Sequence, residues 1–244
     1  MKKRIFPLLS FLLLFGGCVF SPPTPPETLG DIAYDVDKRH GYTVYITEND
    51  EPTPYLVLTD DYNGNVLLLR ERLLDEAVKY NDYGEGYAAL TEEGYQLGYY
   101  NHSIVDKYLN ETFLPWIDAE LQDSIVDSEI TITAEESLGN HGKYVEQITR
   151  KSFLLSYTEL GYEENIIHRI EGKSLKYFED DSDRLIAYNS KEAWPWWLRT
   201  PVTSLFNSSY GIDQKGRCGG GQIETAGFAR RFAFQEIYKL SSKR

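Results

Sequence analysis

The stretch from Trp194 to Pro201, Trp-Pro-Trp-Trp-Leu-Arg-Thr-Pro, is the feature that most constrains the fold of this chain. It holds three of the four tryptophans. Each indole buries roughly 150–250 Å² of surface when it packs, so such a block forms either a dense core or the aromatic floor of a binding site. The residues alone leave both outcomes open.

The start of the chain predicts export. Lys2, Lys3 and Arg4 precede an apolar run from Ile5 to Phe15, and Gly16-Gly17 leads into Cys18. This is the pattern of a cleaved signal peptide over residues 1–17, and the apolar run is shorter than the roughly 20 residues that a spanning helix needs. Leu14 to Cys18 resembles a bacterial lipobox, although Phe15 replaces the usual aliphatic residue. An ordinary secretory signal cut near Ser21 is the alternative.

The lipobox interpretation predicts a protein that is lipid-anchored to the cell membrane through Cys18 and faces the extracellular side. Residues 18–40 would be its linker, because Ser21-Pro-Pro-Thr-Pro-Pro26 favours extended polyproline II, which acts as a semi-rigid spacer. Residues 41–240 are then one domain, long enough for a single core, and residues 241–244 are a tail.

The net charge and the cysteine content limit which binding partners and cross-links this chain can have. Loss of residues 1–17 removes three positive charges and takes the net charge from −13 to −16. That balance argues against nucleic acid, whose binding needs clustered Lys and Arg. Cys218 is the one cysteine left besides Cys18, so no disulfide within the mature monomer and no cysteine-based zinc site is expected. We expect Cys218 to be a small residue in a Gly-rich turn, with a reactive thiol as the lesser alternative.

The pattern of elements predicts an α+β domain. Strands are expected at 42–46, 55–59, 66–70, 126–133 and 151–155, with a tight hairpin turn at Asn63-Gly64. A long loop over 80–100 precedes one helix, which starts at Ser103 and ends near Phe113, and a second helix from Trp116 to about Asp123. Ser156 and Glu159 should cap a helical turn. Four further short strands, at 196–199, 209–213, 222–224 and 230–237, would alternate with glycine turns at Gly216 and 219–221.

The sequence contains no recognisable catalytic or cofactor-binding motif. The four histidines are scattered without metal-ligand spacing, no nucleophile-elbow motif is present, and 219–221 lacks the residues of a phosphate loop. The acidic stretch 179–183 lacks the Gly and distal Glu of a calcium loop, which favours a solvated turn. We therefore predict no metal, no cofactor and no catalytic residue.

Several segments together resemble the DUF6273 family. Trp196-Trp-Leu-Arg-Thr-Pro201 is similar to its WWLRSP block with Thr200 in place of serine, Gly216 matches a following glycine turn, and Arg231-Phe-Ala-Phe234 matches its last strand with Phe232 in place of proline. Tyr108-Leu-Asn110 with Phe113, and Phe153 to Glu159, are similar to two upstream motifs. The resemblance covers nearly all of the domain.

This layout in turn resembles the C-type-lectin-like fold. The likeness implies mixed or antiparallel sheets, two helices between an N-terminal and a C-terminal strand group, and a final strand that pairs back with the first. The calcium-dependent sugar motifs of true lectins are absent from the sequence. Fold resemblance alone does not give function.

The favoured hypothesis is a non-catalytic surface module that binds a glycan, a peptide or a small molecule. Aromatic faces suit sugar rings and arginine suits carboxylates, which gives a candidate site at Trp194, Trp196, Arg199, Tyr210 and Arg230. For Arg199 the simpler explanation is a buried ion pair with a core carboxylate. A structural role in cell-envelope assembly, with an envelope protein as partner, is one alternative. An enzyme related to formylglycine-generating oxidases is another, although Cys218 lacks the second cysteine of that chemistry.

Overall fold

The structure is a computed structural model that describes residues 28–35, 42–82, 90–162, 170–179, 181–222 and 232–236. Its strands are β1 (Thr43–Glu48), β2 (Glu51–Tyr62), β3 (Asn65–Arg70), β4 (Ser128–Thr133), β5 (Val145–Arg150), β6 (Ser152–Leu154), β7 (Trp196–Pro201), β8 (Ser208–Ile212), β9 (Cys218–Gln222) and β10 (Phe232–Glu236). Its helices are α1 (Ile104–Lys107), α2 (Ala119–Gln122) and α3 (Lys176–Glu179). A π-helical segment, Tyr108–Phe113, continues α1, and short 3-10 turns occupy Gly30–Ile32, Leu114–Trp116, Glu135–Ser137 and Ser182–Leu185.

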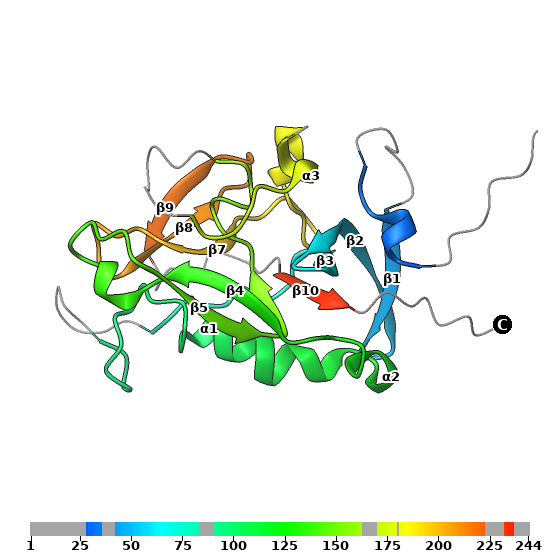
Figure 1. The fold of residues 1–244 in the computed structure, drawn as a ribbon, viewed down its shortest axis with the longest axis horizontal. Coiled ribbons are helices and arrows are strands. Elements are labelled where there is room, and N and C mark those ends of the chain that lie inside the picture. Colours follow the sequence, from blue (N-terminus) through cyan, green and yellow to red (C-terminus); the bar gives the residue numbers. More distant parts are fainter. Residues whose placement is uncertain are drawn as a thin grey trace, which may run out of the picture.

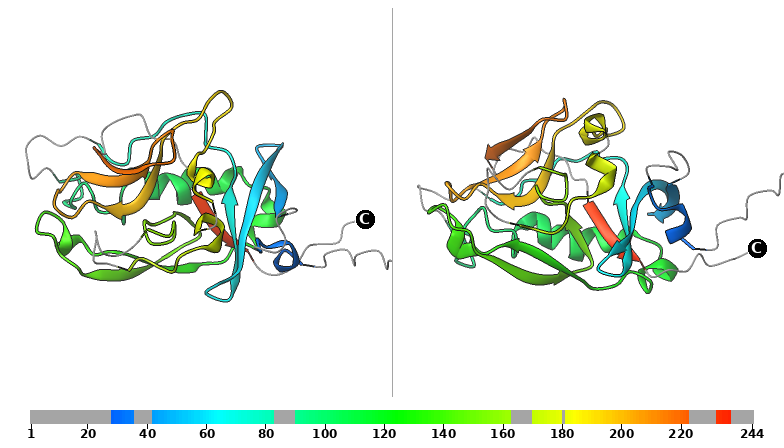
Figure 2. Two further views of the ribbon diagram at one scale, coloured as in Figure 1. Left: turned by 90° about the horizontal axis from the view of Figure 1, so that it is seen from above. Right: turned by 45° about the horizontal axis from the view of Figure 1, so that its top comes forward.

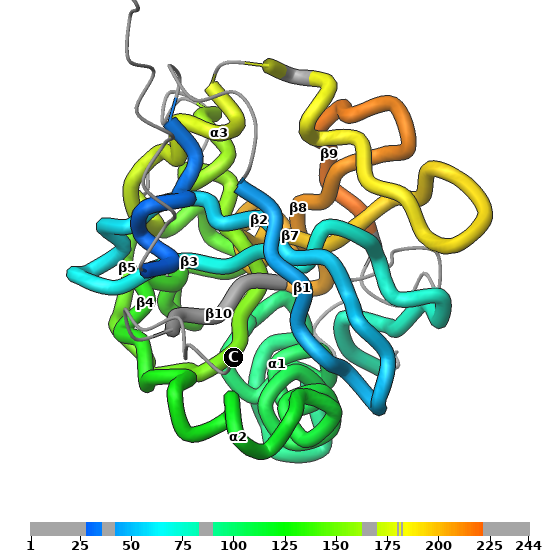
Figure 3. The backbone as a smooth tube through the Cα atoms, turned by 90° about the vertical axis from the view of Figure 1, so that its right-hand side faces the viewer, coloured from blue at the N-terminus to red at the C-terminus, as the bar shows by residue number. Residues whose placement is uncertain are grey.

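The predicted hairpin forms the centre of the main sheet. Asn63 and Gly64 connect β2 to β3 with φ values of 54° and 80°, the left-handed conformation that a tight hairpin requires. The five-stranded sheet has the order β1-β2-β3-β10-β6, and its pairs are antiparallel. Figure 3 shows β2 and β3 side by side. β10, drawn in red in Figure 1, pairs with β3, so the end of the domain returns to its beginning.

The lectin-like layout implied that the last strand pairs with the first. In the structure it does not. β10 lies between β3 and β6, whereas β1 pairs with β2 alone within the described sheet. The hairpin explains the difference, because β2 already has β1 on one side, which leaves the outer edge of β3 open for the returning strand.

The first predicted helix is confirmed. Ser103 caps it, its hydroxyl accepting the N–H of Asp106 at 3.1 Å, and helical structure runs on to Phe113. The second is shorter than predicted, because Pro115 lies in a 3-10 turn and Ile117 is extended. Ile117 is buried and forms an isolated antiparallel β-bridge with Glu48, the last residue of β1. This bridge interrupts the helix, and α2 begins after Asp118, which caps it. Figure 1 shows this helical stretch running along the bottom of the molecule.

Two smaller sheets complete the domain, one of β4 and β5 and one of β7, β8 and β9. The expected glycine turn at 219–221 is wrong, because these residues pair in β9 with Gly211, Tyr210 and Ser209 of β8. The other predicted glycine turn, at Gly216 with φ of 76°, is confirmed and connects β8 to β9. Cys218 accordingly lies in a strand rather than in a turn. Backbone pairing with β8 outweighs the turn preference of three consecutive glycines.

The core lies where these sheets meet. β4 and β6 both contact β7, and Figure 2 shows the small sheets stacked over one another beside the main sheet. Ile130 and Ile132 of β4 are two residues apart and share a buried face of the strand. The result is an α+β domain built mainly of antiparallel strands with few and short helices. Within the described ranges, no helix has the length and apolar character needed to cross a membrane.

Candidate functional site

The tryptophan block divides into core and edge. Trp196, Trp197 and Leu198 have no exposed surface, and the indole N–H of Trp196 donates to the carbonyl of Leu185 at 2.9 Å. Trp194, just before β7, is partly buried, and its indole nitrogen has no hydrogen-bond acceptor among the described residues. In this conformation Trp196 therefore offers no surface to a ligand.

Arg199 follows the tryptophans on β7 and is the centre of a buried polar network. Its guanidinium forms a bidentate ion pair with Glu159, in which Nη1 donates to Oε2 at 2.7 Å and Nη2 donates to Oε1 at 2.8 Å. The other three N–H groups donate to backbone carbonyls, those of Thr131, Leu154 and Glu171. Burial, the largest single effect, would lower the pKa of Arg199, but the charge and hydrogen bonds of Glu159 together with the neighbouring Tyr62 and Glu171 outweigh it and raise that pKa above its usual value. Arg199 is thus a fully paired structural cation.

Local structure holds Glu159 in place for this pair. The expected cap is present: the N–H of Ser156 donates to Glu159 Oε2 at 2.8 Å, and the N–H of Glu159 donates to the Ser156 hydroxyl at 3.1 Å. The segment forms a turn rather than a helix. The hydroxyl of Tyr62, from the end of β2, donates to the remaining oxygen, Oε1. Glu159 therefore joins three separate parts of the chain.

A second buried carboxylate, Glu171, completes the network. It accepts hydrogen bonds from the hydroxyls of Thr133 and Thr200. The Thr200 hydroxyl also accepts the N–H of Tyr157 at 2.9 Å. Thr200 stands where the resembling motif has serine, and its hydroxyl supplies both bonds. The substitution keeps the group that this position needs.

A cleft of about 780 Å³ lies above this network. Its walls come from residues 58–63 around the hairpin, from Glu129, Thr131 and Gln147 of the β4–β5 pair, from 170–176, and from residues near Gly30 to Asp35. Tyr62 belongs both to the cleft and to the Glu159 contacts, and its ring stacks on Phe153 with 5.8 Å between centroids. Arg199 therefore supports the cleft from beneath rather than lining it.

The remaining predicted site residues lie elsewhere. The ring of Tyr210, on β8, packs on Tyr157 with 5.0 Å between centroids, and Tyr157 packs on Tyr162 at 4.7 Å. Neither Trp194 nor Tyr210 lines the cleft. Arg230 and Cys18 lie outside the described residues. The five predicted residues therefore do not form one surface among the positions described.

The cleft residues gave no signal in the sequence. Asp61 to Gly64 is recognisable as a hairpin turn, but nothing in that turn indicates that residues 170–176, more than a hundred positions later, face it across a cleft. Neighbouring carboxylates are too frequent in this acidic chain to single out Glu129. Only the long-range packing brings these segments together.

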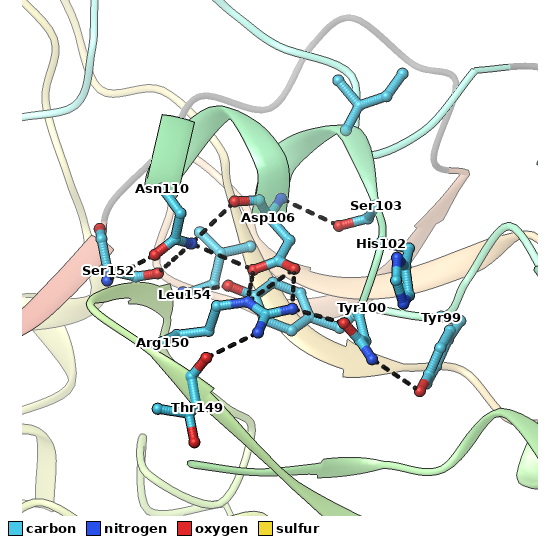
Figure 4. A network of polar contacts seen from close by, with 12 residues as sticks. Tyr99, Tyr100, His102, Ser103, Asp106, Asn110, Thr149, Arg150, Ser152 and Leu154 are labelled. Carbon is cyan, nitrogen blue, oxygen red and sulfur yellow. Dashed lines mark hydrogen bonds and ion pairs between the residues drawn. The ribbon is translucent and has the colours of Figure 1, made fainter. Parts of the chain in front are cut away.

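A second polar network ties the helix to the sheets (Figure 4). Asp106 of α1 is buried and forms an ion pair with Arg150, the last residue of β5. Arg150 Nη2 donates to Asp106 Oδ2 at 2.7 Å. Burial raises the pKa of Asp106 above its ordinary value in spite of this ion pair. Asn110 extends the network to the carbonyl of Ser152. A shallower hollow of about 370 Å³ lies beside it, and its charged groups are of both signs.

The described residues form no candidate metal site. Among the described residues, no three His, Cys, Asp or Glu side chains gather as they would around a metal ion. Cys218 is partly buried, and burial raises the pKa of its thiol to about 12. Such a thiol is protonated at neutral pH and is a poor nucleophile.

The sequence model of the DUF6273 family, described as a domain of unknown function, matches residues 63–234. The chain therefore belongs to the DUF6273 family. The match runs from the hairpin turn to β10 and includes β7 with its buried tryptophans and Arg199. Neither the curated proteins nor the solved structures contain a significant match to the chain.

Proposed function

We propose that this protein is exported, is held at the extracellular side of the cell membrane by a lipid on Cys18, and binds a ligand without catalysing a reaction. The ligand site is the cleft above Arg199 and Glu159. A variant of the C-type-lectin-like fold carries it, a proposal supported by the helices between two strand groups and by the return of β10 to the opening hairpin.

The observation that carries the proposal is a roomy, polar cleft whose floor is held by buried hydrogen bonds. A volume of about 780 Å³ lies within the range of small-molecule sites. Tyr62, at the floor, is held by Glu159, which Arg199 and Ser156 fix in turn. A floor that is ordered before the ligand arrives reduces the entropy lost on binding.

Binding is tested by titrating the full chain, purified in detergent, with glycans, peptidoglycan fragments and peptides by ligand-observed NMR. Gln147→Trp should fill part of the cleft and abolish binding. Val145→Trp is the matched control, since Val145 is exposed on the same strand two residues away and does not line the cleft. A full screen without a bound compound overturns the binding proposal. Specific capture of an envelope protein, unaffected by Gln147→Trp, would favour the assembly role instead.

The anchor has its own test. Metabolic labelling with a radioactive fatty acid should label the wild-type protein and Cys218→Ser equally, and should fail with Cys18→Ser. These are the two cysteines of the chain, so the pair of variants is internally matched. Equal labelling of Cys18→Ser, or secretion of unlabelled wild-type protein, would support the ordinary secretory signal.

The oxidase alternative has less support. Its chemistry uses two cysteines close together, and Cys218 is the one cysteine within the described ranges. The raised pKa of its thiol further disfavours a reactive thiolate. Non-catalytic binding therefore remains the function that the site supports best.

A further inference from the structure

The cleft is lined by charges of opposite sign that come from different segments of the chain. Asp61 of the hairpin and Glu129 of β4 form the acidic wall, while Lys173 and Lys176 form the basic wall. All four side chains are exposed, and none has an ion-pair partner among the described residues. The two walls therefore bring unpaired charges of both signs to one space large enough for a ligand.

The acidic wall is built as a unit. The side-chain amide of Asn63 donates to the backbone carbonyl of Glu129 at 2.9 Å, which fixes the hairpin turn against β4. Asp61 lies two residues before Asn63 and lines the same cleft as Glu129. Asp35 and Asp60 also line the cleft. Negative charge therefore exceeds positive charge around it.

One buried residue, Glu159, contacts the chain segments that carry the two walls. Tyr62 connects the acidic wall to Glu159 through its hydroxyl. On the other side, the N–H of Leu175 donates to the backbone carbonyl of Glu159 at 3.0 Å. Gly172 passes so close that a Cβ there would lie 2.8 Å from Glu159 Oε1. Glu159 is itself held by Arg199, so both walls are tied to one buried and fully paired residue.

We infer that the cleft takes a zwitterionic ligand, a short peptide or amino-acid derivative with a free amine toward Asp61 and Glu129 and a free carboxylate toward Lys173 and Lys176. The inference rests on the proposed binding function and names its ligand class. An extended tripeptide spans roughly 10 Å between its ends, which lets both termini reach charged partners at once. Tyr62 and the exposed Ile170 supply apolar contact between the ends.

The test uses a tripeptide pool without ionisable or cysteine side chains in four forms: free, N-acetylated, C-amidated and capped at both ends. Each form is passed over the immobilised full chain, and retained peptides are measured by mass spectrometry. Loss of one charge pair at an exposed wall should lower retention by up to about fivefold. Acetylation should lower it more than amidation, because acids outnumber lysines around the cleft.

Paired variants assign each end of the peptide to a wall. Asp61→Asn with Glu129→Gln should remove the effect of acetylation and keep that of amidation, and Lys173→Gln with Lys176→Gln should do the reverse. Glu51→Gln and Lys215→Gln change exposed charges that do not line the cleft, and should leave both effects intact.

The outcomes separate this inference from the proposed function. Retention that is indifferent to capping, or no retention of the free pool, overturns the zwitterionic ligand. If another class of compound still binds and is blocked by Gln147→Trp, the binding function stands without it. If no compound of any class binds, both fail together.

Discussion

Arg199 and Glu159 form a two-pronged ion pair in which neither side chain has any exposed surface. The pair joins β7 to the turn after β6 and lies under the cleft. Such a pair is weak evidence for net stabilisation, because both charges lose water when they are buried. Its importance lies in what happens when one partner is removed, since the other is then left charged and unpaired.

Glu159→Gln should therefore be strongly destabilising. It keeps the shape of the side chain but leaves the Arg199 guanidinium without its counter-charge, and it should lower the free energy of unfolding by about 3–5 kcal/mol. Urea denaturation followed by tryptophan fluorescence measures the change. Arg217→Gln is the control, because Arg217 pairs with Asp213 at the surface and its loss should cost less than about 1 kcal/mol. Equal effects of the two substitutions would contradict the role assigned to Glu159.

The sequence supports a correct prediction where the signal is local. Asn63-Gly64 predicts its hairpin because the required positive φ is a property of those two residues. Ser103 predicts its helix for a similar reason. The glycines at 219–221 mislead, because their pairing with β8 is decided by a partner strand and not by their own preference.

The ion pair between Arg199 and Glu159, which lies under the cleft, is likewise only partly predictable from the sequence. That Arg199 pairs with a core carboxylate is predictable from its chemistry, since a buried guanidinium needs a counter-charge. The identity of that carboxylate is not predictable from the sequence. Glu159 lies forty positions away, and the local sequence pattern marks it only as a capping residue. The cleft is harder still to foresee, because backbone segments from distant parts of the chain enclose it.

Gly172→Ala should disturb the junction between the cleft and Glu159. Gly172 has φ of 101°, and an added Cβ would lie 2.8 Å from Glu159 Oε1. Backbone strain of this kind costs about 1–3 kcal/mol, and the immobile carboxylate adds a steric penalty to it. Thermal unfolding should show a lower Tm.

Two glycines separate these contributions. Gly64 also has positive φ, at 80°, but open space around it, so Gly64→Ala should show the backbone cost alone. Gly219 has open space and no positive φ, so Gly219→Ala should change Tm little. If Gly172→Ala is no worse than Gly64→Ala, the close approach to Glu159 has no energetic weight.

The same substitution at two tryptophans should have unequal effects. Trp196→Phe leaves the Leu185 carbonyl without its buried donor and creates a void, so we expect a loss of about 2–4 kcal/mol in the free energy of unfolding. Trp194→Phe removes an indole N–H that has no acceptor among the described residues, and should cost less than about 1 kcal/mol. Urea denaturation of both variants, monitored by far-ultraviolet circular dichroism, gives the comparison. A larger loss at Trp194 would mean that it belongs to the core.

Cys218 should behave as a shielded thiol. Burial raises its pKa from 9.0 to about 12, so the reactive thiolate is scarce near neutral pH. Reaction with Ellman's reagent should be slow at about pH 8 and should rise about tenfold per pH unit without levelling before about pH 11. Because the folded state holds this proton more tightly than the unfolded chain, the associated stability is complete below pH 9.0 and is lost as pH rises toward about 12. Cys218→Ala should flatten the alkaline fall in unfolding free energy. Rapid labelling that levels off near pH 9 would instead indicate an exposed, reactive cysteine and revive the redox alternative.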